Sequence, residues 1–116
     1  MSKPVVDWDQ LDIIADGWGG EFLEIYREFL HDLTADIEAL GKALENNDAE
    51  AAARLAHRIK GSASNFGFEA VRQIAYDVET AAKVPDLTIA SERFSLASAN
   101  FEMCRDEVAS RIPEAA

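Results

Sequence analysis

The sequence predicts an all-α protein: an antiparallel up-down four-helix bundle with a short accessory N-terminal helix. Apolar residues recur every three or four positions along most of the chain, which is the period of one face of an α-helix. No segment combines apolar-polar alternation with a tight turn, so no β-hairpin is expected. Glycine, proline and asparagine divide the chain into five such segments. Helices joined by short connections pack as antiparallel neighbours, which favours the bundle.

The first two segments are expected to be a short and a long helix. The short one starts at Asp7, which has capping-box spacing to Gln10, and ends before Gly17. The long one starts at Glu21, after two glycines, and runs to the polar stretch 46–48. The predicted apolar face of the short helix is Trp8, Leu11, Ile14 and Ala15, and that of the long helix is Phe22, Ile25, Tyr26, Phe29, Leu33, Ile37, Leu40 and Leu44.

Three more helices follow in the prediction. The third runs from about residue 48 to Phe66, where Gly67 suits a left-handed C-terminal position. The fourth covers about 69–83 and ends before Pro85, and the last continues until Pro113. The apolar face of the fourth is Val71, Ile74, Ala75 and Val78, and that of the last is Leu87, Phe94, Ala97, Phe101, Cys104 and Val108. Within this stripe Cys104 is expected to be a small buried apolar residue.

Length, composition and charge limit the possible functions. The 116 residues fit one domain, 1–116, and a hydrophobic content of 48% is enough for a packed core. A net charge of −11 argues against binding to nucleic acids or anionic membranes. The chain has no apolar run of the roughly 20 residues needed by a membrane helix, and residues 1–6 lack a signal-peptide core. The expected compartment is the cytoplasm, which agrees with a single cysteine.

One stretch differs from this acidic background. Residues 51–68 contain no Asp or Glu, but they contain Arg54, Arg58 and Lys60. A helix packed between two neighbours could also lack acids simply because it has little exposed surface. On a helical wheel at about 100° per residue, Leu55 and Ile59 lie opposite a histidine, His57, so this histidine is expected to face solvent. The residues expected on the same face as His57 are Glu50, Arg54, Lys60, Gly61 and Ser64.

Two neighbours of His57 suggest anion chemistry. Lys60 is one turn along, so its ammonium could offset the charge of an anion held by the imidazole. Gly61 costs a helix interior roughly 1 kcal/mol relative to alanine, and a missing side chain there would allow another protein to approach closely. Close packing against another helix is the alternative explanation for Gly61. It is the weaker explanation, because Gly61 is expected on the solvent-exposed face of its helix.

The run from Ala56 to Gly67, AHRIKGSASNFG, resembles the signature of histidine-containing phosphotransfer (HPt) domains, approximately HxxKG followed by small residues and a hydrophobic-Gly pair. The resemblance implies that His57 is the phosphoacceptor, Lys60 its charge partner and Gly61 a clearance position. It also places Glu79 where a Glu or Gln often accepts a hydrogen bond from the imidazole. The residues expected to meet a partner are Arg54, Arg58, Gly61, Ser64 and Asn65, with Gln73 as a weaker candidate.

The resemblance further implies a phosphorelay intermediate of two-component signal transduction. His57 would accept a phosphoryl group from a receiver-domain aspartate and pass it to another receiver. The chain contains no phosphate-binding loop and no paired aspartates suited to Mg²⁺, so it is expected to be a phosphocarrier and not an enzyme. The expected partners are response-regulator receiver domains, which would supply Mg²⁺, and a hybrid histidine kinase. The chain is expected to have no cofactor of its own and, without a second apolar patch, to be a monomer.

Two other functions compete with this interpretation, and the first fails on the number of ligands. Glu28 and His31 form an ExxH pair like those of di-iron bundles, but a second pair is missing because position 54 is an arginine. The other possibility is a helical interaction module without chemistry, or a regulatory domain phosphorylated only by a kinase. The combination of His57, Lys60 and Gly61 favours phosphotransfer over a purely binding module.

Overall fold

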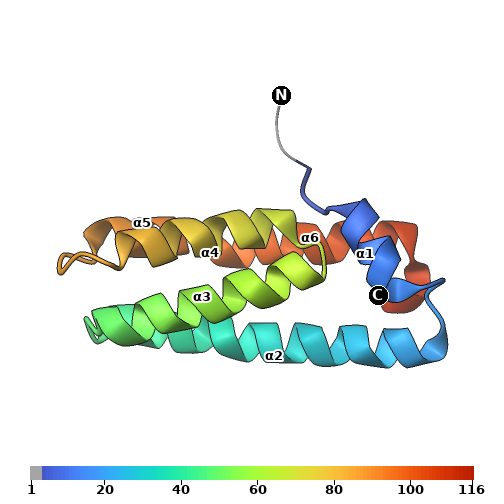
Figure 1. Cartoon of the computed structure of the whole chain (residues 1–116), viewed down its shortest axis with the longest axis horizontal. Coiled ribbons are helices and arrows are strands. Elements are labelled where there is room, and N and C mark those ends of the chain that lie inside the picture. Colours follow the sequence, from blue (N-terminus) through green and yellow to red (C-terminus); the bar gives the residue numbers. More distant parts are fainter. Residues whose placement is uncertain (1–3) are drawn as a thin grey trace.

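A computed structural model describes residues 4–116, and every regular element in this range is helical (Figure 1). The elements are α1 (Trp8–Ala15), α2 (Gly20–Glu45), α3 (Ala49–Asn65), α4 (Glu69–Ala81), α5 (Thr88–Phe94), α6 (Ala97–Arg111) and the short 3₁₀ helix η1 (Pro113–Ala115). Successive long helices run in opposite directions, with α5 and α6 together forming the fourth arm (Figure 1). α3 packs between α2 and α4, and α4 packs against α5 and α6. The predicted four-helix bundle with an accessory N-terminal helix is confirmed.

Local capping residues set the helix boundaries. Asp7 caps α1 by accepting a hydrogen bond from the backbone N–H of Gln10 at 3.2 Å, and Asp48 caps α3 by accepting one from Ala51 at 3.1 Å. Gly67, which follows the C-cap residue Phe66 of α3, has a φ of +68°, a conformation that strongly favours glycine. The backbone N–H of Asp7 donates to the Gly67 carbonyl at 2.7 Å, so the turn between α3 and α4 also holds the start of α1.

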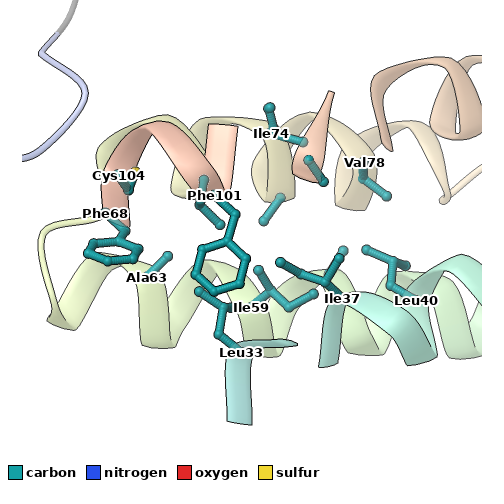
Figure 2. Close-up of a cluster of buried hydrophobic side chains, with 14 of the residues drawn as sticks. Leu33, Ile37, Leu40, Ile59, Ala63, Phe68, Ile74, Val78, Phe101 and Cys104 are labelled. Carbon is teal, nitrogen blue, oxygen red and sulfur yellow. The ribbon is translucent and has the colours of Figure 1, made fainter. Parts of the chain in front are cut away.

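The core lies along the bundle axis and takes residues from every arm (Figure 2). Its central members include Leu33 and Ile37 of α2, Ile59 of α3, Val78 of α4 and Phe101 of α6, all buried. Burial of apolar side chains supplies the main favourable free energy of folding, at about 25 cal/mol per Å². Cys104 is fully buried in this cluster, as predicted, and burial raises the pKa of its thiol to about 12. The thiol is therefore protonated at neutral pH.

Two elements depart from the sequence prediction. Ile25 was expected on the core stripe of α2, but its side chain is 50% exposed, because the packed face of α2 is narrower than the apolar pattern. The last segment is not one helix, since it breaks at Ser95 and Leu96. There the backbone N–H of Leu96 donates to the carbonyl of Arg93, three residues before it, which makes a tighter turn than that of an α-helix. The Ser95 hydroxyl donates to the Glu92 carbonyl at 2.6 Å and so competes with regular helical hydrogen bonding.

α1 is fastened across one end of the bundle. The Trp8 indole N–H donates to Glu107 of α6 at 2.8 Å, and the Arg111 guanidinium lies 4.1 Å from the centre of the Trp8 ring. The Gln10 amide donates to the carbonyl of Asn65 at 3.0 Å. These contacts hold α1 beside the C-terminal end of α3.

None of the helices found in residues 4–116 is long and apolar enough to cross a membrane.

Candidate functional site

The candidate site is centred on His57 in the middle of α3. The imidazole side chain is 69% exposed, whereas Leu55 and Ile59 of the same helix are buried. This is the orientation that the helical wheel predicted. α1, although fastened near the end of α3, leaves the ring open to solvent.

Glu79 of α4 contacts the imidazole from the neighbouring helix. Its Oε2 lies 2.7 Å from His57 Nδ1. A carboxylate can only accept hydrogen bonds, so Nδ1 must carry the proton and donate it. A neutral imidazole protonated at Nδ1 keeps a lone pair on Nε2. No residue in the range 4–116 forms a hydrogen bond with Nε2, so the ring is held on one edge and available on the other.

The same carboxylate also binds Lys60. The Lys60 ammonium donates to Glu79 Oε1 at 2.7 Å, so one carboxylate bridges the imidazole and the ammonium. The Glu79 side chain is only 13% exposed. The hydrogen bond from Lys60 is the largest cause of a lowered pKa for Glu79, and the bond from His57 lowers it further, while burial acts in the opposite direction. Glu79 is therefore ionised at neutral pH, and its charge is balanced by Lys60.

Small side chains leave the surface next to His57 open. A Cβ atom added at Gly61 would meet nothing within 4 Å, so close helix packing does not explain this glycine. Arg54, Ser64 and Asn65 are exposed on the same helix. The face around His57 therefore has room for another protein, with the cationic Arg54 at one side.

Arg58 lies differently from the other residues predicted to meet a partner. Its guanidinium makes two hydrogen bonds to Asp36 of α2, at 2.6 and 3.2 Å, so its charge is already paired across the α2–α3 seam. Gln73, the weaker candidate, donates to Asp77 within α4 at 3.1 Å. The Arg58 contact depends on how α2 and α3 are packed, which a helical wheel of one helix does not report. The Gln73–Asp77 contact joins positions i and i+4 of one helix, so its spacing was visible in the sequence.

Sequence reasoning did not single out two features near His57. The first is Tyr76 of α4, whose ring centre lies 5.8 Å from the Lys60 ammonium. Tyr76 is three residues before Glu79, so both lie on one face of α4, and this spacing could have predicted that Tyr76 is close to the site.

The second feature is a groove of about 370 Å³ between α2 and α3. Its lining consists of Arg58, Ser62, four apolar residues and three acidic ones: Ile25, Phe29, Leu33 and Phe66, with Glu28, Asp32 and Asp36.

The ExxH pair considered for metal binding lies on α2. Glu28 and His31 are both exposed there. Within residues 4–116, no three His, Cys, Asp or Glu side chains are grouped so that they could hold a metal ion.

Comparisons with known proteins identify the family of this chain. The family model described as "Hpt domain" matches residues 24–112. The chain is similar to the crystal structure of histidine-containing phosphotransfer protein B (HptB) from Pseudomonas aeruginosa PAO1, with a TM-score of 0.85 and 24% identity over 95% of this chain and 96% of that chain. A comparison with curated proteins finds no match. The matched family model covers most of the chain, including the whole of α3 and α4, and the protein therefore belongs to the Hpt family of histidine phosphotransfer proteins, the phosphocarriers of phosphorelays.

Proposed function

We propose that this protein is a phosphorelay intermediate that accepts a phosphoryl group on His57 Nε2 from the aspartyl phosphate of a receiver domain and passes it to the aspartate of another receiver. The observation that carries the proposal is the outward imidazole, held at Nδ1 by Glu79 at 2.7 Å. A ring fixed in this way presents a nucleophilic nitrogen to a partner without having to change its tautomer.

The transfer step follows from this arrangement. The Nε2 lone pair attacks phosphorus, and the N–P bond forms as the P–O bond to the donor aspartate breaks, leaving a free carboxylate. Nδ1 keeps its proton, so the product is a phosphorylated imidazolium. The Glu79 carboxylate lies against the charged edge of that ring and stabilises it. Attack by a second receiver's aspartate reverses these bond changes and restores the neutral imidazole.

Lys60 supplies part of the electrostatic stabilisation. Its ammonium shares a carboxylate with His57, so it lies beside the ring that would carry the phosphoryl group. Phosphoryl transfer depends mainly on in-line positioning and on neutralising the charge of the transferred oxygens. One ammonium meets only part of that requirement. We infer that the receiver contributes Mg²⁺ and the remaining catalytic groups, and that this chain is a carrier without independent catalytic activity.

The docking surface proposed for the receiver covers the His57 face and the neighbouring α2–α3 groove. Gly61 and Ser64 allow close approach, and Arg54 can meet the acidic pocket of a receiver. Ile25, half-exposed at the edge of the groove, offers apolar contact. Charges of this kind mainly accelerate encounter, so binding is expected to be transient.

Transfer assays with two kinds of donor test this function. Incubation with a phosphorylated receiver domain should label the wild-type chain and not His57→Gln, while circular dichroism shows that the variant remains helical. His31→Gln is the matched control, because His31 is also an exposed helical histidine, and it should label like the wild type. Labelling of the His57→Gln variant would reject the assignment. Labelling by an ATP-charged histidine kinase but by no receiver would favour a regulatory phosphoacceptor domain.

A further inference from the structure

We propose that Tyr76 is a positioning residue for phosphoryl transfer. Its ring keeps the Lys60 ammonium beside His57 while that ammonium turns from the Glu79 carboxylate to the incoming phosphoryl group. The inference rests on the proposed function of His57. Tyr76 lies on α4, one turn before Glu79, and its ring centre is 5.8 Å from Lys60 Nζ. A cation at this distance from an aromatic ring is attracted by the ring quadrupole.

Packing of the core does not explain Tyr76. The residue is 47% exposed, whereas the buried face of α4 consists of Val71, Ile74, Ala75 and Val78. An exposed tyrosine at this place covers a lysine that extends from α3 across to α4. The Lys60 side chain is accordingly only 28% exposed, which is low for a lysine near the centre of an open face.

The ring and the carboxylate hold Lys60 by different means. Glu79 neutralises the ammonium, so this carboxylate competes with an incoming phosphoryl group for the same cation. The Tyr76 ring attracts the ammonium through its quadrupole and holds it without neutralising it. When a phosphoryl group arrives on Nε2, Lys60 can turn from Glu79 Oε1 towards the new anion and still remain against the ring. A flexible lysine side chain held in this way loses less entropy during the transfer.

The expected effect is modest and specific to the ring. An exposed cation–π contact changes an equilibrium by about two- to five-fold. We therefore expect Tyr76→Leu to slow phosphorylation of His57 by about two- to five-fold, and Tyr76→Phe, which keeps the ring, to react like the wild type. Ile89→Ala on α5 is the control, because Ile89 is 55% exposed and lies on another helix.

The experiment uses phosphoramidate, a small phosphoryl donor, because it removes any contribution of Tyr76 to receiver docking. Phosphohistidine formation on the full chain is followed by ³¹P NMR for the wild type and these variants, alone and combined with Lys60→Met. The proposal expects Tyr76→Leu to have no effect when Lys60 is already replaced. It also expects the Lys60 methylene protons nearest the ammonium to be shifted upfield by the ring in the wild type and in Tyr76→Phe, and not in Tyr76→Leu.

The outcomes separate this inference from the function on which it rests. A wild-type chain that forms no phosphohistidine at His57 with any donor overturns both. A labelled wild type together with an equally fast Tyr76→Leu variant overturns the role of Tyr76 alone. The same holds if Tyr76→Leu slows the reaction equally in the Lys60→Met background, because the tyrosine would then act without the lysine.

Discussion

Replacing Gly61 by alanine is expected to make the protein more stable and slower in phosphotransfer. Gly61 lies inside α3, and an alanine Cβ there would meet nothing within 4 Å. Alanine is favoured over glycine in a helix interior by roughly 1 kcal/mol, because glycine loses more backbone entropy on folding. For a domain of this size such a gain raises the melting temperature by about 3–6 °C.

The same methyl group would stand on the surface where a receiver must come close to His57. Misplacement of reacting groups by about 1 Å can cost on the order of 100-fold in rate, so we expect about a 10-fold slower transfer from a phosphorylated receiver. Gly61→Gln should be slower still. Labelling by phosphoramidate should stay within about two-fold of the wild type, because only a large partner meets the added side chain.

Gly41 provides a matched control within α2. A Cβ added there would lie 3.1 Å from the Phe94 ring, so the helix-propensity gain would be offset by displacement of the ring. Thermal unfolding of both alanine variants and single-turnover transfer from a receiver give the required data. The reasoning is refuted if Gly61→Ala transfers as fast as the wild type, or if it is no more stable than Gly41→Ala.

Three further perturbations test separate parts of the structure. Lys60→Ala should slow transfer from a receiver several-fold while His57 still becomes labelled, and a wild-type rate would remove Lys60 from the mechanism. Gly67→Ala should lower the free energy of unfolding by about 2–4 kcal/mol in urea titrations, because φ is +68° and the new Cβ would collide with the Asp7 carbonyl. Gly19→Ala has open space around its Cβ and should cost clearly less, because it loses only the preference of the N-cap position for glycine over alanine. Equal effects of the two substitutions would show that the conformation of Gly67 is not the cause. The pKa of Glu79 is lowered in the folded state, so its ion pair stabilises the fold above the ordinary glutamate pKa of 4.5 and this contribution is lost as the pH falls through the lower folded value. The stability difference between wild type and Glu79→Gln should therefore shrink from pH 7 to pH 3, and a constant difference would show that the charge of Glu79 is not involved.

The local part of the fold was predictable because helices follow a fixed period. The wheel placed His57 outward and Ile59 inward, and the capping-box spacing of Asp7 marked a real helix start. The break at Ser95 escaped prediction because the apolar stripe continues through it without a glycine or proline.

Contacts between helices were less accessible to sequence reasoning. His57 and Glu79 are 22 positions apart on different helices, and only the family resemblance suggested their contact. The Asp36 partner of Arg58 and the second bond of Glu79, to Lys60, were not anticipated. Such pairs depend on the rotation and separation of packed helices, which tertiary packing determines. The periodic pattern of a single helix carries no information on either quantity.

The proposed relay depends on His57 Nε2 as the phosphoacceptor, and locating the acid-labile phosphate shows whether this nitrogen is used. Mass spectrometry at neutral to alkaline pH after transfer from a receiver should place the phosphate on His57, and ³¹P NMR should identify the Nε2-linked isomer. Phosphate on His31, on an aspartate, or on His57 Nδ1 would contradict the account, because Nδ1 is the nitrogen that binds Glu79.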